Sequence, residues 1–227
     1  MNLMIDLETL GTITEAPVIS IGACFFTETG IEEKFYAVLN VSEQIDSGKR
    51  KVDGATIKWW MGQEGAAKKV FKDDIGVQVC TPASASQYIG SLNYKSFHNV
   101  NKQILSEFVL FCNRYGEMTC KPWGNGSVFD ITILESILRD YELPIPWKFR
   151  NIRDLRTFKE YVYDGAGMVF AGTSHNALDD AVNQAAVVIE GLYRQRKDTE
   201  ITYAPEKLPL RQSFTLFLAD FKARISK

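Results

Sequence analysis

The sequence predicts a mixed α/β fold in a single domain over residues 1–227, and two observations carry this prediction. Three strand-like runs follow one another at the start of the chain, a pattern typical of antiparallel neighbours in a sheet. The second half instead repeats apolar residues at three- and four-residue steps, which is the spacing of one helix face. No repeat, low-complexity tract or convincing linker interrupts the chain, so its length fits one large domain better than two small ones.

The expected strands are apolar runs bounded by turn residues. The first three cover residues 2–8, 17–27 and 34–39, and a turn at residues 28–30 separates the second from the third. A further short run at residues 119–123 is also strand-like. We therefore expect a mixed sheet that begins with three antiparallel strands and is flanked by helices.

The expected helices are segments in which apolar residues return at helical spacing. The clearest begins at Asn176, because Leu178, Val182, Ala185 and Ile189 recur along one face. The set comprises residues 56–61, 102–114, 127–141 and 176–196, followed by a connector at 197–209 and a final amphipathic helix at about 210–225. Helices should thus dominate the second half of the fold.

Composition narrows the class of protein. The chain is 45% hydrophobic and 24% charged, with a formal net charge of −2, so a global positive field that attracts polyanions is excluded. Its apolar runs are too short to cross a bilayer and its start lacks a secretory pattern, so we expect a cytoplasmic protein without membrane contact. The four cysteines lack C-x-x-C spacing and are expected to be reduced, structural thiols.

Four acidic residues and one histidine lie where expected elements begin or end. Asp6 and Glu8 are two positions apart on a strand, so their side chains share a face and can hold one cation between them. Asp130 falls in the first turn of a helix, where favourable interaction with the helix dipole would also account for a carboxylate. Asp180 and His175 flank the start of a later helix. Together these residues are candidates for a metal-dependent site.

The segment around His175 supports this interpretation. Asn176 is a natural N-cap, and Asp179 three residues later fits the second position of a capping box. Asp180 points about 100° away around the helix and is free to face another neighbour. A histidine near carboxylates and their cations can accept a proton from water at neutral pH. His98, in contrast, has no acidic neighbours in the sequence.

The order of these motifs resembles that of the DEDDh 3′ to 5′ exonucleases, which have the ribonuclease H-like fold. The matching motifs, over residues 6–180, are Asp6-x-Glu8, then Asn125-x-x-x-Phe129-Asp130-x-x-Ile133-Leu134, then His175-x-x-x-x-Asp180. Thr9-x-Gly11 follows the first motif. The segment Thr56-x-x-Trp59-Trp60-x-x-Gln63 is also similar to one in the phage exonuclease A and exonuclease VIII group and in related small bacterial exoribonucleases.

The resemblance implies a two-metal mechanism. Two Mg²⁺ or Mn²⁺ ions, about 3.5 to 4 Å apart in such sites, would be held by the carboxylates, with Asp6 bridging both. Glu8 and Asp180 would complete the site of the water-activating ion, and Asp130 would support the second ion. His175 would be the general base, and nucleoside 5′-monophosphates would be released from a free 3′ end.

Residues after the first motif and the paired tryptophans are expected to bind the substrate. Gly11 would let the backbone approach the terminal nucleotide and Leu10 would pack on its base, although an ordinary strand-to-loop glycine is equally consistent. Trp59 and Trp60 are candidates for stacking on bases. Since neighbours on a helix cannot face the same way, we expect one buried tryptophan and one near the groove. The full expected set is Thr9, Leu10, Gly11, Trp59, Trp60 and Phe129.

The basic stretch Lys49-Arg50-Lys51, with Lys58 not far along the chain, is the best candidate for phosphate contacts, and a solvated loop is the alternative. DNA is favoured as the substrate because the tryptophan segment is similar to the phage enzymes. An exoribonuclease that trims RNA 3′ ends is the close alternative, followed by an inactive nucleic-acid-binding module. A metal-dependent phosphatase would not explain Phe129 or the spacing from His175 to Asp180. The amphipathic C-terminal segment is also compatible with a homodimer.

Overall fold

The computed structural model describes most of the chain, and its internal contacts divide the chain into two units, residues 1–192 and 193–227. The described residues are 1–73, 75–81, 84–87 and 99–202. The candidate site residues discussed below lie in the first unit. The amphipathic helix expected at residues 210–225 and His98 lie outside the described residues.

The described residues contain one mixed sheet in the order β5-β4-β3-β2-β1-β6-β7. The strands are β1 (Asn2–Thr9), β2 (Val18–Thr27), β3 (Gly30–Val38), β4 (Gly76–Thr81), β5 (Ser84–Gln87), β6 (Lys121–Gly124) and β7 (Arg153–Asp154). Neighbours from β1 to β5 pair antiparallel, whereas β6 pairs parallel with both β1 and β7. The predicted mixed sheet with an antiparallel start is therefore confirmed.

The helices agree with the apolar periodicity at most of the expected positions. They are α1 (Val41–Asp46), α2 (Gly54–Gly62), α3 (Val100–Cys112), α4 (Ser127–Asp140), α5 (Leu155–Tyr161) and α6 (Ala177–Thr202), with short 3₁₀ turns at Ala67–Phe71 and Phe149–Asn151. The connector expected from residue 197 is wrong at its start, because α6 continues to Thr202. No glycine or proline occurs between Lys197 and Thr202 to end the helix.

Several elements were not expected from the sequence. β4, β5, α1 and α5 are short, so few residues carry their periodicity. β3 also begins earlier than expected, at Gly30, because Ile31 pairs with Phe26 although two glutamates follow it. The four cysteines are free thiols, as expected. Among the described residues, no helix is long and apolar enough to cross a membrane.

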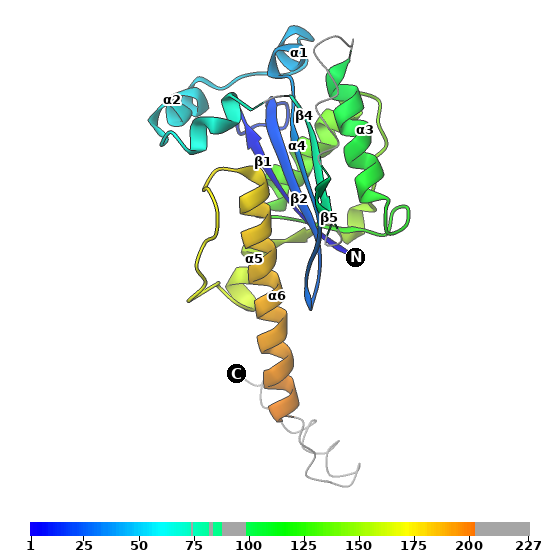
Figure 1. Ribbon diagram of the computed structural model, residues 1–227, viewed down its shortest axis with the longest axis vertical. Helices are drawn as coiled ribbons and strands as arrows, with labels where there is room; N and C mark the ends of the chain where they lie inside the picture. Colours follow the sequence, from blue (N-terminus) through cyan, green and yellow to red (C-terminus); the bar gives the residue numbers. More distant parts are fainter. Residues whose placement is uncertain (74, 82–83, 88–98, 203–227) are drawn as a thin grey trace, which may run out of the picture. The chain divides into compact units, whose positions relative to one another are not determined.

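The two faces of the sheet carry different clusters, and β1 shows the division. Its residues Leu3, Ile5 and Leu7 pack into a core with apolar side chains of α3 and α4. Met4 points the other way, into a second core with side chains of α5 and α6. Figure 1 shows α6 beside β1 and β2, with α3 and α4 on the other side of these strands. Since strand residues alternate in direction, Asp6 and Glu8 share the α6 face with Met4.

Helix α6 approaches this face closely because of a glycine. A Cβ atom added to Gly22 on β2 would lie 2.0 Å from the carbonyl carbon of Ala177, the first residue of α6. Gly22 is also the register partner of Asp6. The glycine therefore brings the start of α6, and with it Asp180, onto the strand pair that carries Asp6.

Candidate active site

The structure brings the five predicted catalytic residues to one place from separate segments. Asp6 and Glu8 come from β1, Asp130 from the first turn of α4, and Asp180 from the first turn of α6. His175 lies in the loop just before α6. Burial raises the pKa of Asp6, and the charges of Asp130, Glu8 and Asp180 raise it further, so the carboxyl groups influence one another. The motifs are thus neighbours in space as well as ordered in the chain.

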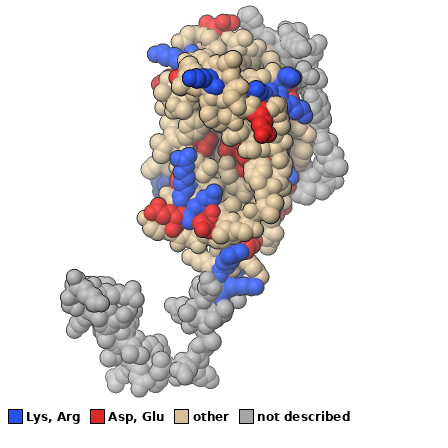
Figure 2. All heavy atoms as spheres, turned by 90° about the vertical axis from the view of Figure 1, so that its left-hand side faces the viewer, with Lys and Arg blue, Asp and Glu red and all other residues tan. Residues whose placement is uncertain are grey.

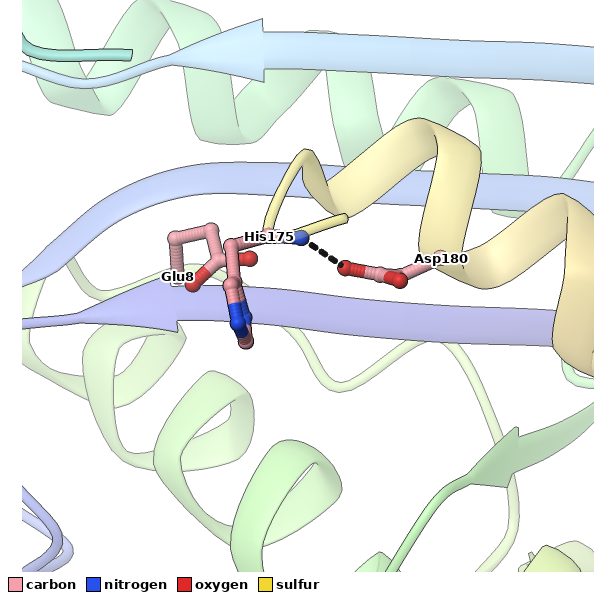
Figure 3. Close-up of side chains that lie close together, drawn as sticks. All are labelled: Glu8, His175 and Asp180. Atoms are coloured by element: carbon pink, nitrogen blue, oxygen red, sulfur yellow. Dashed lines mark hydrogen bonds between the residues drawn. The ribbon is translucent and has the colours of Figure 1, made fainter. Parts of the chain in front are cut away.

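Glu8, His175 and Asp180 form the tightest part of this site. One ligand atom from each lies within 4.8 Å of the others, a separation that one metal ion can bridge. Figure 3 shows the three side chains together and the hydrogen bond that the His175 backbone N–H donates to Oδ2 of Asp180 over 2.9 Å. His175 has a φ of 63°, a left-handed conformation that is uncommon outside glycine. The hydrogen bond to Asp180 therefore holds the His175 backbone at the start of α6.

Asp130 is held against the edge of β1. It is only 3% exposed, and its Oδ1 accepts a hydrogen bond of 3.3 Å from the Leu7 backbone N–H. Burial raises the pKa of Asp130 to about 7, while that hydrogen bond and the charge of Arg156 oppose the rise. Gly124 leaves room for this side chain, because a Cβ there would lie 3.1 Å from Oδ2 of Asp130.

Asp6 has a partner that the sequence motifs did not indicate. The side-chain amide of Gln184 donates a 2.7 Å hydrogen bond to Oδ1 of Asp6. Burial raises the pKa of Asp6 well above its usual range, and this hydrogen bond acts in the opposite direction. Gln184 lies four residues after Asp180 on the same helix face, so helical spacing from the third motif is the signal that would have found it.

The electrostatics of the site favour cations. Burial raises the pKa of Glu8 to about 8, and the charges of Asp180 and Asp130 add to the rise. Burial also raises the pKa of Asp180, against the hydrogen bond from the His175 N–H. Figure 2 shows acidic side chains recessed near the middle of one face, with basic side chains at the surface around them. A cluster of buried carboxylate oxygens is a donor set suited to hard divalent cations.

A hollow of about 540 Å³, called here the first hollow, opens beside Glu8. Side chains and backbone of Thr9, Gly11, Thr12, Asp53, Thr56, Trp59, Trp60 and Phe129 help to line it. Trp59 is 45% exposed whereas Trp60 is 3% exposed, so the expected division into one exposed and one buried tryptophan is confirmed. The Trp60 indole N–H donates to the Thr9 backbone oxygen over 3.0 Å. Trp60 thus joins α2 to the end of β1.

Trp59 also contacts the histidine. The ring centroids of Trp59 and His175 are 5.0 Å apart and nearly perpendicular, at 86°. Trp59 makes a second edge contact with Trp60, at 5.0 Å. The exposed tryptophan therefore both lines the first hollow and contacts the His175 ring.

The other substrate-binding candidates differ in position. Gly11 lines the first hollow, and its carbonyl oxygen accepts a 2.7 Å hydrogen bond from the Thr9 hydroxyl. Leu10 does not line it, because its side chain is buried among Ile19, Trp60 and neighbouring apolar residues. The structure therefore gives Leu10 a packing role and offers no support for contact with a base.

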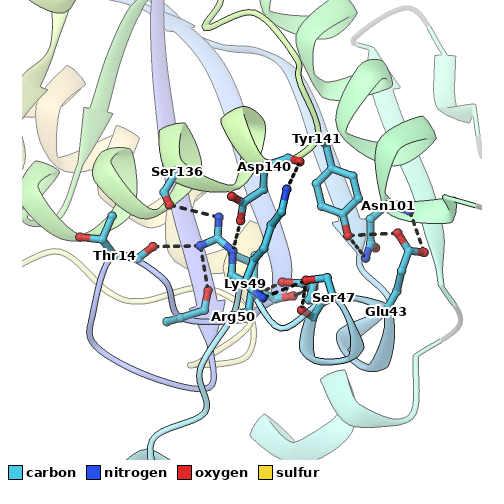
Figure 4. A network of polar contacts seen from close by, with 12 residues as sticks. Thr14, Glu43, Ser47, Lys49, Arg50, Asn101, Ser136, Asp140 and Tyr141 are labelled. Carbon is cyan, nitrogen blue, oxygen red and sulfur yellow. Dashed lines mark hydrogen bonds and ion pairs between the residues drawn. The ribbon is translucent and has the colours of Figure 1, made fainter.

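The basic stretch does not form the expected phosphate-binding patch. Arg50 is 4% exposed and pairs with Asp140 over 2.8 Å, and its guanidinium also donates to the Thr14 carbonyl oxygen. Figure 4 shows this network, in which the Lys49 ammonium donates to the Asp140 backbone oxygen over 3.1 Å. Lys51 remains exposed. Arg50 therefore joins the loop after α1 to the end of α4.

The start of α6 agrees with the sequence only in part. The side chain of Asn176 caps the helix, since its Oδ1 accepts hydrogen bonds from the N–H groups of Leu178 and Asp179. The expected capping box is wrong, because the Asp179 carboxylate accepts from the Thr173 N–H instead, over 2.8 Å. Asp179 thereby fixes the loop that carries His175.

Comparison with known structures supports the fold. The nuclease domain of 3′hExo, a DEDDh family member bound to rAMP, aligns with 85% of this chain and 92% of its own, with a TM-score of 0.50 and 13% identity. A full-length 3′-exonuclease aligns with 86% of this chain and 82% of its own, at 13% identity and a TM-score of 0.47. Cell-death related nuclease 4 (CRN-4) aligns with 85% of this chain and 64% of its own, at 13% identity and a TM-score of 0.40. No curated protein shows significant sequence similarity to the chain.

The fold and the order of the three motifs place the protein in the class of DEDDh-type 3′-5′ exonucleases, which are hydrolytic nucleases. A family model that matches residues 1–192 identifies the branch of this class. The chain belongs to the Rv2179c-like family of 3′-5′ exoribonuclease domains. Its matched length coincides with the first unit of the fold.

Proposed function

We propose that the protein is a two-metal exonuclease that removes nucleoside 5′-monophosphates from RNA 3′ ends. The observation that carries this proposal is the convergence of Asp6, Glu8, Asp130 and Asp180 with His175 beside the first hollow. The raised pKa values of the carboxyl groups fit the cation requirement, because neighbouring buried carboxylates are unfavourable unless protons or cations offset their charge.

The four carboxylates would hold two Mg²⁺ or Mn²⁺ ions, with Asp6 as the bridging ligand, Glu8 and Asp180 on one ion and Asp130 on the other. When bound, such ions lower the pKa of water and stabilise charge on the attacking and leaving oxygens. His175 accepts the proton that the attacking water gives up. The water oxygen then bonds to the phosphorus, and the bond from phosphorus to the 3′ oxygen breaks. The 3′ oxygen leaves with the electron pair and takes up a proton from solvent to become a hydroxyl, so the released nucleotide carries the 5′-phosphate.

The terminal nucleotide would occupy the first hollow. Its volume of about 540 Å³ is within the range of small-molecule sites. Trp59 and Phe129 offer aromatic surface for the base, and Gly11 presents backbone without a side chain. A stacked base is worth roughly 1 to 3 kcal/mol in comparable complexes. Because Glu8 lines this hollow, a nucleotide bound there would have its scissile phosphate close to the carboxylates.

RNA is preferred to DNA in this proposal. The family is described as exoribonucleases, and the similar 3′hExo domain was solved with rAMP. The earlier preference for DNA depended on the tryptophan segment, yet Trp60 is a buried residue that pairs with the end of β1. Packing therefore explains Trp60, which is one of the two tryptophans on which the preference for DNA depended. A cytoplasmic location and a homodimer remain predictions.

The test is a shortening assay on matched single-stranded RNA and DNA labelled at the 5′ end, with Mg²⁺, Mn²⁺ or a chelator. We expect a ladder of products that shortens from the 3′ end only when metal is present, and faster on RNA. An Asp6→Ala variant is the matched control and should leave both strands intact. Failure of the parent protein to shorten either strand with metal would refute the proposed function.

A further inference from the structure

A second hollow borders the cluster of carboxylates and shares no lining residue with the first hollow. It measures about 280 Å³, and one wall consists of Asn125, Asp180 and Gln184. Asp180 is one of the proposed metal ligands, and Gln184 is hydrogen-bonded to Asp6. The second hollow therefore borders the proposed metal ligands.

The opposite wall is a loop with exposed apolar side chains. Val169 is 89% exposed and Phe170 is 45% exposed, and both line the second hollow together with Met168. Exposed apolar surface next to a charged site requires an explanation, because such patches on soluble proteins commonly mark binding sites. An aromatic side chain in this position offers a face to a flat, apolar ligand.

This loop is fixed to the helix that carries the catalytic aspartate. Asn183 on α6 accepts a hydrogen bond from the Ala171 N–H over 2.9 Å, and its amide donates to the Ala171 carbonyl oxygen over 2.8 Å. The Tyr163 hydroxyl donates to the Ala166 carbonyl oxygen over 2.6 Å. The apolar residues between these two anchors are therefore held at a set distance from Asp180.

Helix α5 supplies positive charge at the same place. Lys159 lines the second hollow. Arg156, one turn earlier on α5, lies against Gly126, where an added Cβ would come within 3.0 Å of its guanidinium carbon. Among the described residues neither side chain forms an ion pair. Both are thus available to a phosphate group beside the acidic site.

We propose that the second hollow binds the nucleotide next to the 3′-terminal one in a single-stranded substrate, an inference that rests on the proposed function. The base of this nucleotide packs on Phe170 and Val169, and Lys159 contacts the phosphate on its 5′ side. The strand then passes from the first hollow, across the carboxylates, into the second hollow.

The test compares two substrates that differ in this nucleotide. A single-stranded RNA oligomer fills both hollows, whereas the p-nitrophenyl ester of uridine 5′-monophosphate places only its nitrophenyl leaving group toward the second hollow, without a second nucleotide or a phosphate on its 5′ side. We expect Phe170→Ala to lower kcat/KM on the oligomer by roughly 5- to 150-fold, the range for loss of one base stack, and to lower ester hydrolysis by a clearly smaller factor. Lys159→Gln should lower kcat/KM on the oligomer and flatten its salt dependence.

An oligomer with an abasic residue next to its 3′ end provides the second comparison. The parent protein should lose on this substrate about the factor that Phe170→Ala loses on the intact oligomer, and Phe170→Ala should lose no more. Phe149→Ala is the control, because Phe149 is 80% exposed and lines neither hollow.

The outcomes separate this inference from the proposed function. Equal losses on oligomer and ester, or no loss on the oligomer, would overturn the second subsite while the exonuclease function stands. A parent protein that hydrolyses neither substrate would overturn the proposed function and the subsite with it.

Discussion

His175 illustrates how single residues acquire a role from their surroundings. Its backbone N–H donates a hydrogen bond to Asp180, and its ring packs against Trp59. These two contacts hold the imidazole beside Glu8. The same position would allow the ring to be a metal ligand or a general base. We propose the proton transfer for it because the four carboxylates would already supply ligands for two ions.

The His175→Ala variant tests this assignment. Loss of a general base typically costs 10²- to 10⁴-fold in rate, so kcat should fall by roughly that range. Binding of Mn²⁺, followed by the increase in melting temperature that the ion produces, should be retained. Asp6→Ala should lose both properties. Loss of Mn²⁺ binding in His175→Ala would instead identify the histidine as a ligand.

Gln184 is the second residue whose role the structure supplies. Its hydrogen bond to Asp6 orients the proposed bridging carboxylate. Removal of such a supporting partner typically lowers metal affinity 10- to 100-fold, so Gln184→Ala should raise the Mn²⁺ concentration for half-maximal activity by about that factor. Gln103→Ala, an exposed change on α3, is the control. An unchanged Mn²⁺ requirement in Gln184→Ala would contradict this role.

At the scale of elements, the contact between β2 and α6 determines the site. Gly22 permits the backbone of Ala177 to lie directly on the strand, and the loop before α6 is fixed by Asp179. Neither Gly22 nor Asp179 is itself a proposed ligand of the metal ions. The Gly22 contact and the Asp179 hydrogen bond nevertheless determine where Asp180 and His175 lie.

Gly22→Ala should therefore displace the start of α6. A side chain forced into a packed contact typically costs about 1 to 3 kcal/mol of stability, and a contact with backbone is at the upper end. We expect a lower free energy of unfolding in urea and a loss of Mn²⁺ binding. Gly54→Ala, where an added Cβ meets nothing within 4 Å, should change neither. A fully active Gly22→Ala variant would show that α6 is not held by this contact.

At the scale of the whole molecule, the buried carboxylates connect folding to pH and metal. Burial raises the pKa of Glu8 from 4.5 to about 8, so between these values the folded protein binds more protons than the unfolded chain. Stability without metal should then fall as pH rises through this window. Mn²⁺ should offset the fall, and its stabilising effect should grow with pH.

Melting temperatures between pH 5 and 8, with chelator and with Mn²⁺, measure this effect. Glu8→Gln removes the titrating group and should flatten the fall seen with chelator. A parent protein whose melting temperature does not decrease relative to Glu8→Gln across this range would contradict the account.

The sequence predicted the site better than its surroundings. The proposed catalytic residues belong to local motifs, so spacing and order in the sequence predicted Asp6, Glu8 and His175, and the structure brings them together. Contacts that join distant segments leave no such pattern. Arg50 was read as an exposed cation although it pairs with Asp140, and Leu10 was assigned to a base although it packs beside Trp60. Burial of these side chains is decided by the fold.

The central claim is that this site hydrolyses the terminal phosphodiester with water. The most direct measurement is digestion of single-stranded RNA with Mn²⁺ in ¹⁸O-labelled water, followed by mass spectrometry of the released nucleotides. The account predicts nucleoside 5′-monophosphates with one ¹⁸O atom on the phosphate. Unlabelled or cyclic phosphates, or nucleotides with a 3′-phosphate, would show a different reaction and contradict it.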